Sequence, residues 1–309
     1  MRKILLAATV AAFALTGPAE AVDFSQAVPV WRIGILGGEN EADRLRSYQC
    51  LVDHIGQEFG IGVELYPATD YAGVMQGLIA GNLESAHLGA SAYAGIYLQD
   101  PNAVEPLVTE VQIDGSLGYH AGMYARADSG IASMDDMRGK ALAFADPNSA
   151  SGYLVPNFEL NQRGYPTEGP NAFFGRVGFS GGHEQGIVAV LNGQYDAAVT
   201  WISGQGSFED GYTRGMLRNM VDKGALQTSD LVEVWRSDLI ANGPLVIRQA
   251  LPAAVKDAYR DFLVAMIDRD PQCYRNITAG EGAGYAPIDH SFYEGIVEMR
   301  RATMAARRG

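Results

Sequence analysis

A serine-containing segment in the middle of the chain has residue types that can bind a small anion. Residues 146–152 read DPNSASG and lie between a predicted strand and a predicted helix. The first backbone N–H groups of a helix have no partner within the helix, and the helix dipole is positive at that end. With the hydroxyls of Ser149 and Ser151, they predict an oxyanion site without a basic side chain. The alternative is that one serine only caps the helix.

A second loop-to-helix junction, GGHE at residues 181–184, has similar properties. The glycines permit close approach of a ligand to the backbone, and His183 at the helix start can donate a hydrogen bond to an anion. The alternative is a plain helix start, in which Glu184 complements the helix dipole and His183 is solvated. The residue types alone leave both interpretations open.

Three aromatic residues lie at predicted element ends, where they could line a binding site: Tyr71, Tyr119 and Trp201. A phenol can donate a hydrogen bond to a ligand oxygen, and an aromatic ring can cover an alkyl chain or a cation. The alternative is that these residues belong to the core, as isolated aromatic residues usually do.

Nothing in the sequence specifically indicates catalysis or a bound metal. A serine hydrolase is an alternative because serine, histidine and carboxylates are present, but the chain has no G-x-S-x-G elbow. The segment at 146–152 also does not match a nucleotide-binding P-loop. The five histidines are dispersed, and no CxxC or HExxH spacing occurs. We therefore expect a protein that is not an enzyme and that has neither a metal nor a cofactor.

The composition excludes two further classes of protein. The chain has 309 residues, of which 47% are hydrophobic, and its formal net charge is −13. Such a chain can form a sizeable core, which disfavours disorder, and its acidity disfavours nucleic-acid binding. The same acidity argues at first sight against an anionic ligand. A localised helix-terminus site avoids this conflict because distant carboxylates are screened over about 8 Å at physiological salt.

The N-terminus has the pattern of a secretory signal peptide over residues 1–21. A short basic start is followed by an apolar stretch too short to span a membrane and by the cleavage-like Ala19-Glu20-Ala21. We expect a soluble, exported, periplasmic protein that begins near Val22. The only two cysteines, Cys50 and Cys273, could form one disulfide in an oxidising compartment, or they could be two buried thiols.

Short apolar runs alternate with segments of helical periodicity, which predicts an α/β fold with parallel pairing and helices on both faces of each sheet. The predicted strands are 30–36, 63–66, 84–88, 104–110, 120–125, 141–144, 176–179, 197–201, 231–236 and 245–248. The predicted helices are 41–59, 71–80, 91–98, 152–162, 183–192, 212–223, 252–266 and 291–306. The absence of a linker predicts two lobes joined by crossovers, with a cleft between them.

Four motifs, in order along most of the mature chain, carry a family resemblance. They are DYAG at 70–73 with QG at 76–77, GSxGY at 115–119, DPNSxSGxLVP at 146–156 and GHE at 182–184. Together they resemble the periplasmic phosphonate-binding proteins of ABC importers, within the phosphate, phosphite and phosphonate group. The resemblance implies a two-lobed type II periplasmic binding protein fold that closes over its ligand.

The resemblance also implies which residues hold the ligand. The phosphonate oxygens would contact Tyr71, Tyr119, Ser149, the amide of Ala150, Ser151 and His183. The relatives have a threonine at the position of Ala150, so one hydroxyl donor is missing here. The carboxylates that bind the amine of aminoethylphosphonate in the family correspond to Ser203 and Gly243. Substitutes for these carboxylates could be Trp201, Glu184 or Asp210.

The predicted function is a monomeric receptor that captures 2-aminoethylphosphonate or a related alkylphosphonate for an ABC permease and ATPase. The alternative is a receptor for phosphite, phosphate or a sulfonate. We expect one lobe at 22–121 plus 248–309 and the other at 122–247, with hinges near 119–123 and 244–248. Ligand would stabilise the closed form.

Overall fold

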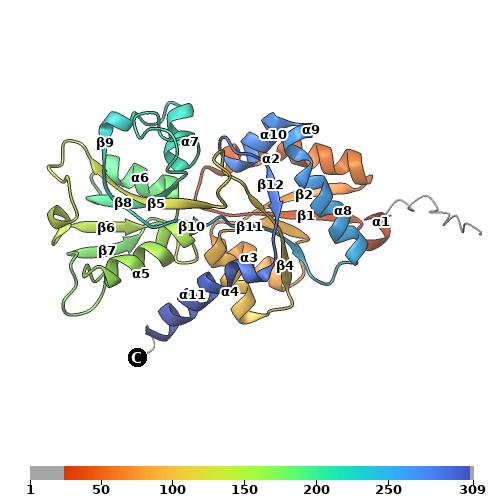
Figure 1. Cartoon of the computed structure of the whole chain (residues 1–309), viewed down its shortest axis with the longest axis horizontal. Helices are drawn as coiled ribbons and strands as arrows, with labels where there is room; N and C mark the ends of the chain where they lie inside the picture. Colours follow the sequence, from red (N-terminus) through yellow and green to blue (C-terminus); the bar gives the residue numbers. More distant parts are fainter. Residues whose placement is uncertain (1–23, 307–309) are drawn as a thin grey trace, which may run out of the picture.

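The computed structural model describes residues 24–306, which form two α/β lobes side by side (Figure 1). The predicted signal peptide lies outside these residues. The first lobe is built on a six-stranded sheet of order β12-β4-β11-β3-β1-β2. Its strands are β1 Val30–Ile35, β2 Gly62–Pro67, β3 Ser85–His87, β4 Val104–Glu110, β11 Pro244–Arg248 and β12 Tyr285–Pro287.

Side chains of the first sheet alternate between two packed faces, as strand geometry requires. Ile33 and Ile35 belong to the apolar cluster formed with α2 and α8, whereas Ala86 and Val246 belong to the cluster formed with α3 and α4. The helices of this lobe are α1 Phe24–Ala27, α2 Glu41–Phe59, α3 Tyr71–Ile79, α4 Ala90–Gln99, α8 Ala253–Val264, α9 Met266–Arg269, α10 Pro271–Thr278, η4 His290–Tyr293 and α11 Glu294–Ala306.

The second lobe contains a sheet of order β10-β5-β8-β6-β7, with β9 also paired to β5. Its strands are β5 Gly118–Arg126, β6 Ala141–Phe144, β7 Arg176–Phe179, β8 Ala197–Ile202, β9 Leu231–Arg236 and β10 Ile240–Ala241. Its helical segments are η1 Asp135–Met137, η2 Ala150–Leu154, α5 Val155–Gln162, α6 His183–Leu191, α7 Met216–Asp222 and η3 Thr228–Asp230. The two-lobed α/β architecture is confirmed.

Parallel pairing holds for only part of each sheet. The β1–β2, β1–β3, β6–β7 and β6–β8 pairs are parallel, but β4 pairs antiparallel with β11 and β12 instead of joining β3. In the second lobe, β5 pairs antiparallel with β8 and β9. The expectation of parallel pairing was wrong for these strands because the chain returns to the first sheet late, as β11, and inserts between β3 and β4.

The chain passes between the two sheets twice, at residues 111–117 and 242–243. β11 pairs within the first sheet and β5 lies wholly in the second, so these crossovers differ from the predicted boundaries at 121/122 and 247/248. Asn242 joins the crossovers: its Nδ2 donates to the carbonyl of Glu110 at 2.8 Å, and its backbone N donates to the carbonyl of Leu117 at 2.9 Å. We propose that the lobes divide and hinge at these segments.

The helix predicted at 212–223 begins later than expected, at Met216. Tyr212 has a φ of 67° and Gly215 a φ of 122°, conformations that a right-handed helix cannot contain. Arg214 instead forms an isolated β-bridge with Gly280. This irregular segment directs Arg214 toward the first lobe.

Candidate functional site

A cavity of about 170 Å³ lies where the two lobes meet. Both lobes contribute to its wall, for example with Tyr71 from the first lobe and Ser149 from the second. Most of the side chains predicted as ligand-binding line it: Tyr71, Tyr119, Ser149, Ser151, His183 and Trp201. The fold therefore brings together residues from four motifs that are far apart in the sequence.

Four helical segments begin at the wall of this cavity. Tyr71 and His183 are the first residues of α3 and α6, while Gly89 and Ser149 are the N-caps of α4 and η2. Helix N-termini present unpaired N–H groups and the positive end of the helix dipole. Four of them at one cavity create a local environment that favours an anion, whatever the net charge of the whole chain.

Ser149 combines the two roles that the sequence left open. Its Oγ accepts a hydrogen bond from the backbone N–H of Gly152 at 2.9 Å, so it does cap the helical segment. The same Oγ lies 3.1 Å from His183 Nε2 and at the cavity wall. Since a serine oxygen has two lone pairs and one proton, capping does not prevent the hydroxyl from donating to a ligand.

His183 is buried and neutral near physiological pH. Burial lowers the pKa of its imidazole to about 3, with a smaller contribution from the positive charge of Arg44. Its Nδ1 lies 3.3 Å from Thr200 Oγ1. If Thr200 donates to Nδ1, then His183 Nε2–H donates to Ser149, and the Ser149 hydroxyl proton is left for the ligand. In this tautomer His183 orients Ser149 as well as lining the cavity.

The two cavity tyrosines are hydrogen-bond donors at neutral pH. Burial raises the pKa of Tyr119 to about 12, although its hydrogen bond with Ser151 opposes the shift. Burial, with the negative charge of Glu39, also raises the pKa of Tyr71. The backbone N–H of Tyr71 donates to Asp146 Oδ2 at 3.4 Å, across the lobe boundary. Both phenols therefore stay protonated beside the serine segment.

Three residues proposed from the sequence are not part of the cavity wall that the described residues form. Ala150 is buried behind it, and Asp210 is exposed and bonded to Ser207. Glu184 instead bridges the lobes: its Oε2 accepts from the backbone N–H of Asn40 at 3.2 Å and lies 3.8 Å from Lys223 Nζ.

Lys223 strengthens this contact between the lobes. Its Nζ, at the end of α7, lies 2.8 Å from Asp43 Oδ2 in the first turn of α2. Gly38 and Gly182 also approach so closely that a Cβ on Gly38 would lie 2.9 Å from Gly182 Cα. The structure is therefore a closed arrangement of the two lobes.

The two positions that correspond to the family's amine-binding carboxylates contribute no acidic group to the cavity. The Ser203 hydroxyl is buried and bonded to Thr213 Oγ1 at 2.9 Å. Gly243 does line the cavity, but a Cβ there would lie 1.8 Å from the carbonyl oxygen of Leu88. With this backbone, position 243 cannot hold a side chain at all.

No motif in the sequence indicated the charged residues that line the cavity. They are Glu39, Asp43, Arg44, Glu110, Arg214 and Lys223. Arg214 and Glu110 form an ion pair in which both side chains are almost completely buried. The Arg214–Glu110 and Lys223–Asp43 pairs join residues far apart in the sequence and form only when the lobes pack, whereas Arg44 pairs with Glu39 within the first lobe.

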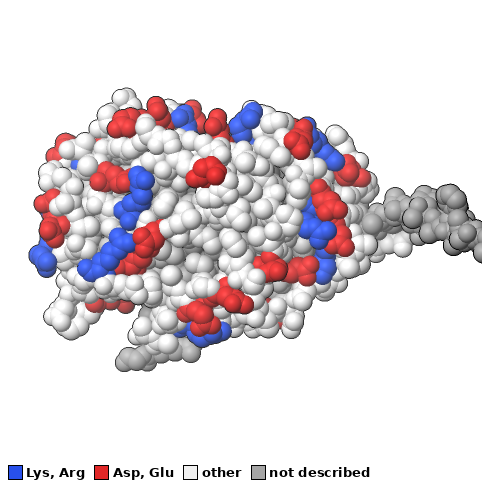
Figure 2. Space-filling view, viewed as in Figure 1, with Lys and Arg blue, Asp and Glu red and all other residues white. Residues whose placement is uncertain are grey.

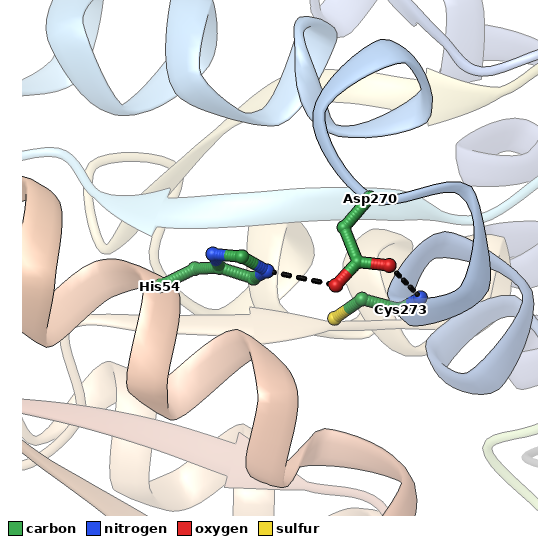
Figure 3. A group of neighbouring side chains, drawn as sticks. All are labelled: His54, Asp270 and Cys273. Carbon is green, nitrogen blue, oxygen red and sulfur yellow. Dashed lines mark hydrogen bonds and ion pairs between the residues drawn. The ribbon is translucent and has the colours of Figure 1, made fainter.

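The cysteine pair lies away from the cavity and fastens α10 to α2. Cys50 and Cys273 form a disulfide with their Cα atoms 5.8 Å apart. Beside it, His54 Nε2 lies 3.0 Å from Asp270 Oδ2, and Asp270 Oδ1 accepts from the backbone N–H of Cys273 at 2.9 Å (Figure 3). The sulfur is already used in the disulfide, so this group has no thiolate to offer a metal.

Acidic and basic side chains are interspersed on the face shown in Figure 2. Such a surface supports the view that the local helix termini, and not a basic patch, would attract an anion. Within the described residues, every helix is too short or too polar to cross a bilayer.

Comparison with known proteins agrees with the motifs. Residues 33–293 match the family described as "ABC transporter, phosphonate, periplasmic substrate-binding protein". The "Phosphate-import protein PhnD" of Mycolicibacterium smegmatis is 30% identical over 279 residues, which cover 85% of this chain and 83% of the relative. The "Phosphonates-binding periplasmic protein" of Escherichia coli is 27% identical over 255 residues, covering 81% of this chain and 69% of the relative.

Solved structures show the same fold. A binding protein component of an ABC phosphonate transporter from Pseudomonas aeruginosa has a TM-score of 0.75 at 25% identity, covering 90% of this chain and 88% of that protein. PhnD1 from Prochlorococcus marinus, in complex with methylphosphonate, has a TM-score of 0.74 at 18% identity, covering 89% of this chain and 98% of that protein. The fold is the two-lobed type II periplasmic binding protein fold. The chain belongs to the family of periplasmic substrate-binding proteins of phosphonate ABC transporters.

Proposed function

We propose that this chain captures a phosphonate in the periplasm and delivers it to the permease and ATPase of an ABC importer. The observation that carries the proposal is the convergence of four helix N-termini, with the hydroxyls of Ser149, Ser151, Tyr71 and Tyr119, on one closed cavity. A phosphonate group has three oxygens that accept hydrogen bonds, and the helix N-termini and these four hydroxyls can donate to them. Export by the N-terminal signal peptide is part of the same proposal.

The ligand is held between the lobes, so binding and closure are coupled. Tyr71 belongs to the first lobe, while Ser149 and Ser151 belong to the second. A ligand that contacts both favours the closed form by its differential affinity for that form. The transporter would recognise the closed receptor.

Removing one donor from each lobe tests the site. The double variant Ser151→Ala and Tyr71→Phe should bind methylphosphonate at least about tenfold more weakly, which corresponds to about 1.4 kcal/mol. Isothermal titration calorimetry measures the change. The control variant Ser291→Ala and Tyr66→Phe makes the same chemical changes at exposed positions and should bind normally. Unchanged affinity in the first variant would contradict the proposed pocket.

A receptor for another oxyanion is the second candidate, because the relative from Mycolicibacterium smegmatis is named for phosphate import. A thermal-shift panel of methylphosphonate, aminoethylphosphonate, phosphite, phosphate and taurine separates these ligands. Stronger stabilisation by phosphate, phosphite or taurine than by either phosphonate would replace the phosphonate assignment.

The site is poorly suited to hydrolysis, although Ser149 and His183 are in contact. A general base works best when its pKa is near the operating pH, whereas the pKa of His183 is about 3 because the side chain is buried. Its other nitrogen faces the hydroxyl of Thr200 and not a carboxylate. Stoichiometric binding without turnover of a chromogenic phosphate ester is therefore expected.

A further inference from the structure

One end of the cavity wall contains a buried ion pair. Arg214 Nη2 is bonded to Glu110 Oε2, and each residue is 3% exposed. Arg214 Nε also donates to the carbonyl oxygen of Thr278 at the end of α10, at 3.3 Å. Since the two side chains carry opposite charges, this end of the cavity is close to neutral.

The pair has hydrogen-bonding capacity that the protein does not use. Among the described residues, neither Arg214 Nη1 nor Glu110 Oε1 has a hydrogen-bond partner, and both residues line the cavity. His87 Nε2 is 3.6 Å from Glu110 Oε1, beyond hydrogen-bond range, and burial lowers the pKa of His87 so that it stays neutral. Unpaired buried groups are costly, so a ligand group that reached these two atoms would gain by pairing with them.

Tyr119 and Trp201 connect this ion pair to the anion site. The Tyr119 hydroxyl bonds with the Ser151 side chain and lies within electrostatic reach of both Glu110 and Arg214. The Trp201 ring is 6.2 Å from the Tyr119 ring, centroid to centroid, and 5.4 Å from Arg214 Cζ. One small molecule with its anionic group at Ser151 could therefore extend along these rings to the ion pair.

The chemistry of the free groups discriminates among substituents on such a molecule. An ammonium would pair with Glu110 Oε1 but would face the positive charge of Arg214, and it would leave Nη1 without an acceptor. A carboxylate would accept from Arg214 but would face the negative charge of Glu110. A hydroxyl can donate to Glu110 and accept from Arg214 at once, without adding a charge.

We propose that the Arg214–Glu110 pair selects a phosphonate whose alkyl chain carries a neutral hydroxyl group. The inference rests on the proposed function, because it assigns the substituent of the ligand that the serine segment holds. Arg214 and Glu110 would be specificity-determining residues.

Calorimetry with four related ligands tests the selection on the wild-type protein. We expect 2-hydroxyethylphosphonate to bind about tenfold more tightly than ethylphosphonate, because it completes two hydrogen bonds to charged groups. Aminoethylphosphonate and phosphonoacetate should both bind more weakly than the hydroxyl compound. Equal affinity for the hydroxyl and ethyl compounds, or preference for either charged one, would overturn the inference.

Two substitutions that remove one charge each make the test independent of that single ranking. Glu110→Gln leaves the positive charge of Arg214 uncompensated. The affinity for phosphonoacetate should therefore rise at least about tenfold relative to the affinity for aminoethylphosphonate. Arg214→Gln should shift the same ratio in the opposite direction. Glu105→Gln, on the same strand but paired with Lys256 outside the cavity, should leave the ratio unchanged.

The design separates this inference from the proposed function. Ethylphosphonate reports on the anion site and on folding in every variant. If no phosphonate binds the wild-type protein, the proposed function fails. Ethylphosphonate could also bind to all variants while the ratio of affinities for phosphonoacetate and aminoethylphosphonate stays the same. In that case only solvent occupies the ion-pair end, and the proposed selection by the Arg214–Glu110 pair is refuted.

Discussion

The buried imidazole of His183 should make the protein sensitive to mild acid. An unfolded chain presents histidine with an ordinary pKa of about 6.5, whereas the folded protein holds the pKa of His183 at about 3 because burial disfavours its charged form. Between these values the unfolded state binds more protons than the folded state. Stability from this group is therefore complete above pH 6.5 and declines as the pH falls toward 3.

The size of the effect follows from these two pKa values. At pH 7.5 almost all of the imidazole is neutral in both states, so protonation of His183 has little effect on the free energy of unfolding. At pH 5.0 the unfolded imidazole is almost fully protonated while the folded one is not, which destabilises the protein by about 2 kcal/mol. Other titrating groups add their own pH dependence, so the prediction concerns the difference between wild-type and a variant.

The variant His183→Gln removes the titrating group and keeps an amide that can donate to Ser149. Urea unfolding at pH 7.5 and 5.0, followed by circular dichroism, gives the loss of unfolding free energy for each protein. We expect the loss to be about 2 kcal/mol smaller in His183→Gln than in the wild-type protein. His120→Gln, at a partly exposed histidine, keeps the buried imidazole and should keep the wild-type loss. Equal losses in wild-type and His183→Gln would refute the reasoning.

Two further predictions concern closure and the disulfide. Lys223→Met keeps the aliphatic stem but removes the ion pair with Asp43, so phosphonate affinity should fall about two- to fivefold, and the difference should shrink at 1 M salt; a salt-independent difference would contradict the electrostatic explanation. Replacing Cys50 and Cys273 by serine opens a link between residues 223 positions apart, and the unfolding free energy should decrease by about 2–5 kcal/mol in calorimetry or urea titration. No loss of stability would show that α10 is held by its packing alone.

Local chemistry made much of the anion site predictable. The N-cap of a helix and the free N–H groups after it are properties of neighbouring residues, so the segment at 146–152 could be proposed as an anion site, with helix capping as the alternative, without tertiary information. The N-cap of α3, Asp70, is local in the same way: its carboxylate accepts from the Gly73 N–H at 2.9 Å. The sequence was a poorer guide to strand pairing between distant segments. β11 follows the whole second lobe in the chain, yet it lies between β3 and β4 in the first sheet.

The helix expected at 212–223 shows the opposite case. Its apolar spacing favours a helix, but Tyr212 and Gly215 have left-handed φ values, and Gly215 and Arg214 form bridges with Ile202 of β8 and with Gly280. Tertiary contacts therefore outweighed local periodicity, and they freed Arg214 to reach the cavity.

The sequence by itself determined the alternation of strands and helices, the serine segment and the family, because these depend on residues close together or on ordered motifs. Only the tertiary structure decided what else lines the cavity. Glu110 and Arg214 are 104 positions apart, and they meet because the lobes close on each other. The sequence shows a glycine at position 243, but only the packing shows that the Leu88 carbonyl leaves no room for a side chain there. Charge pairs and close backbone contacts across a lobe boundary depend on the packing of whole elements, and no local pattern encodes them.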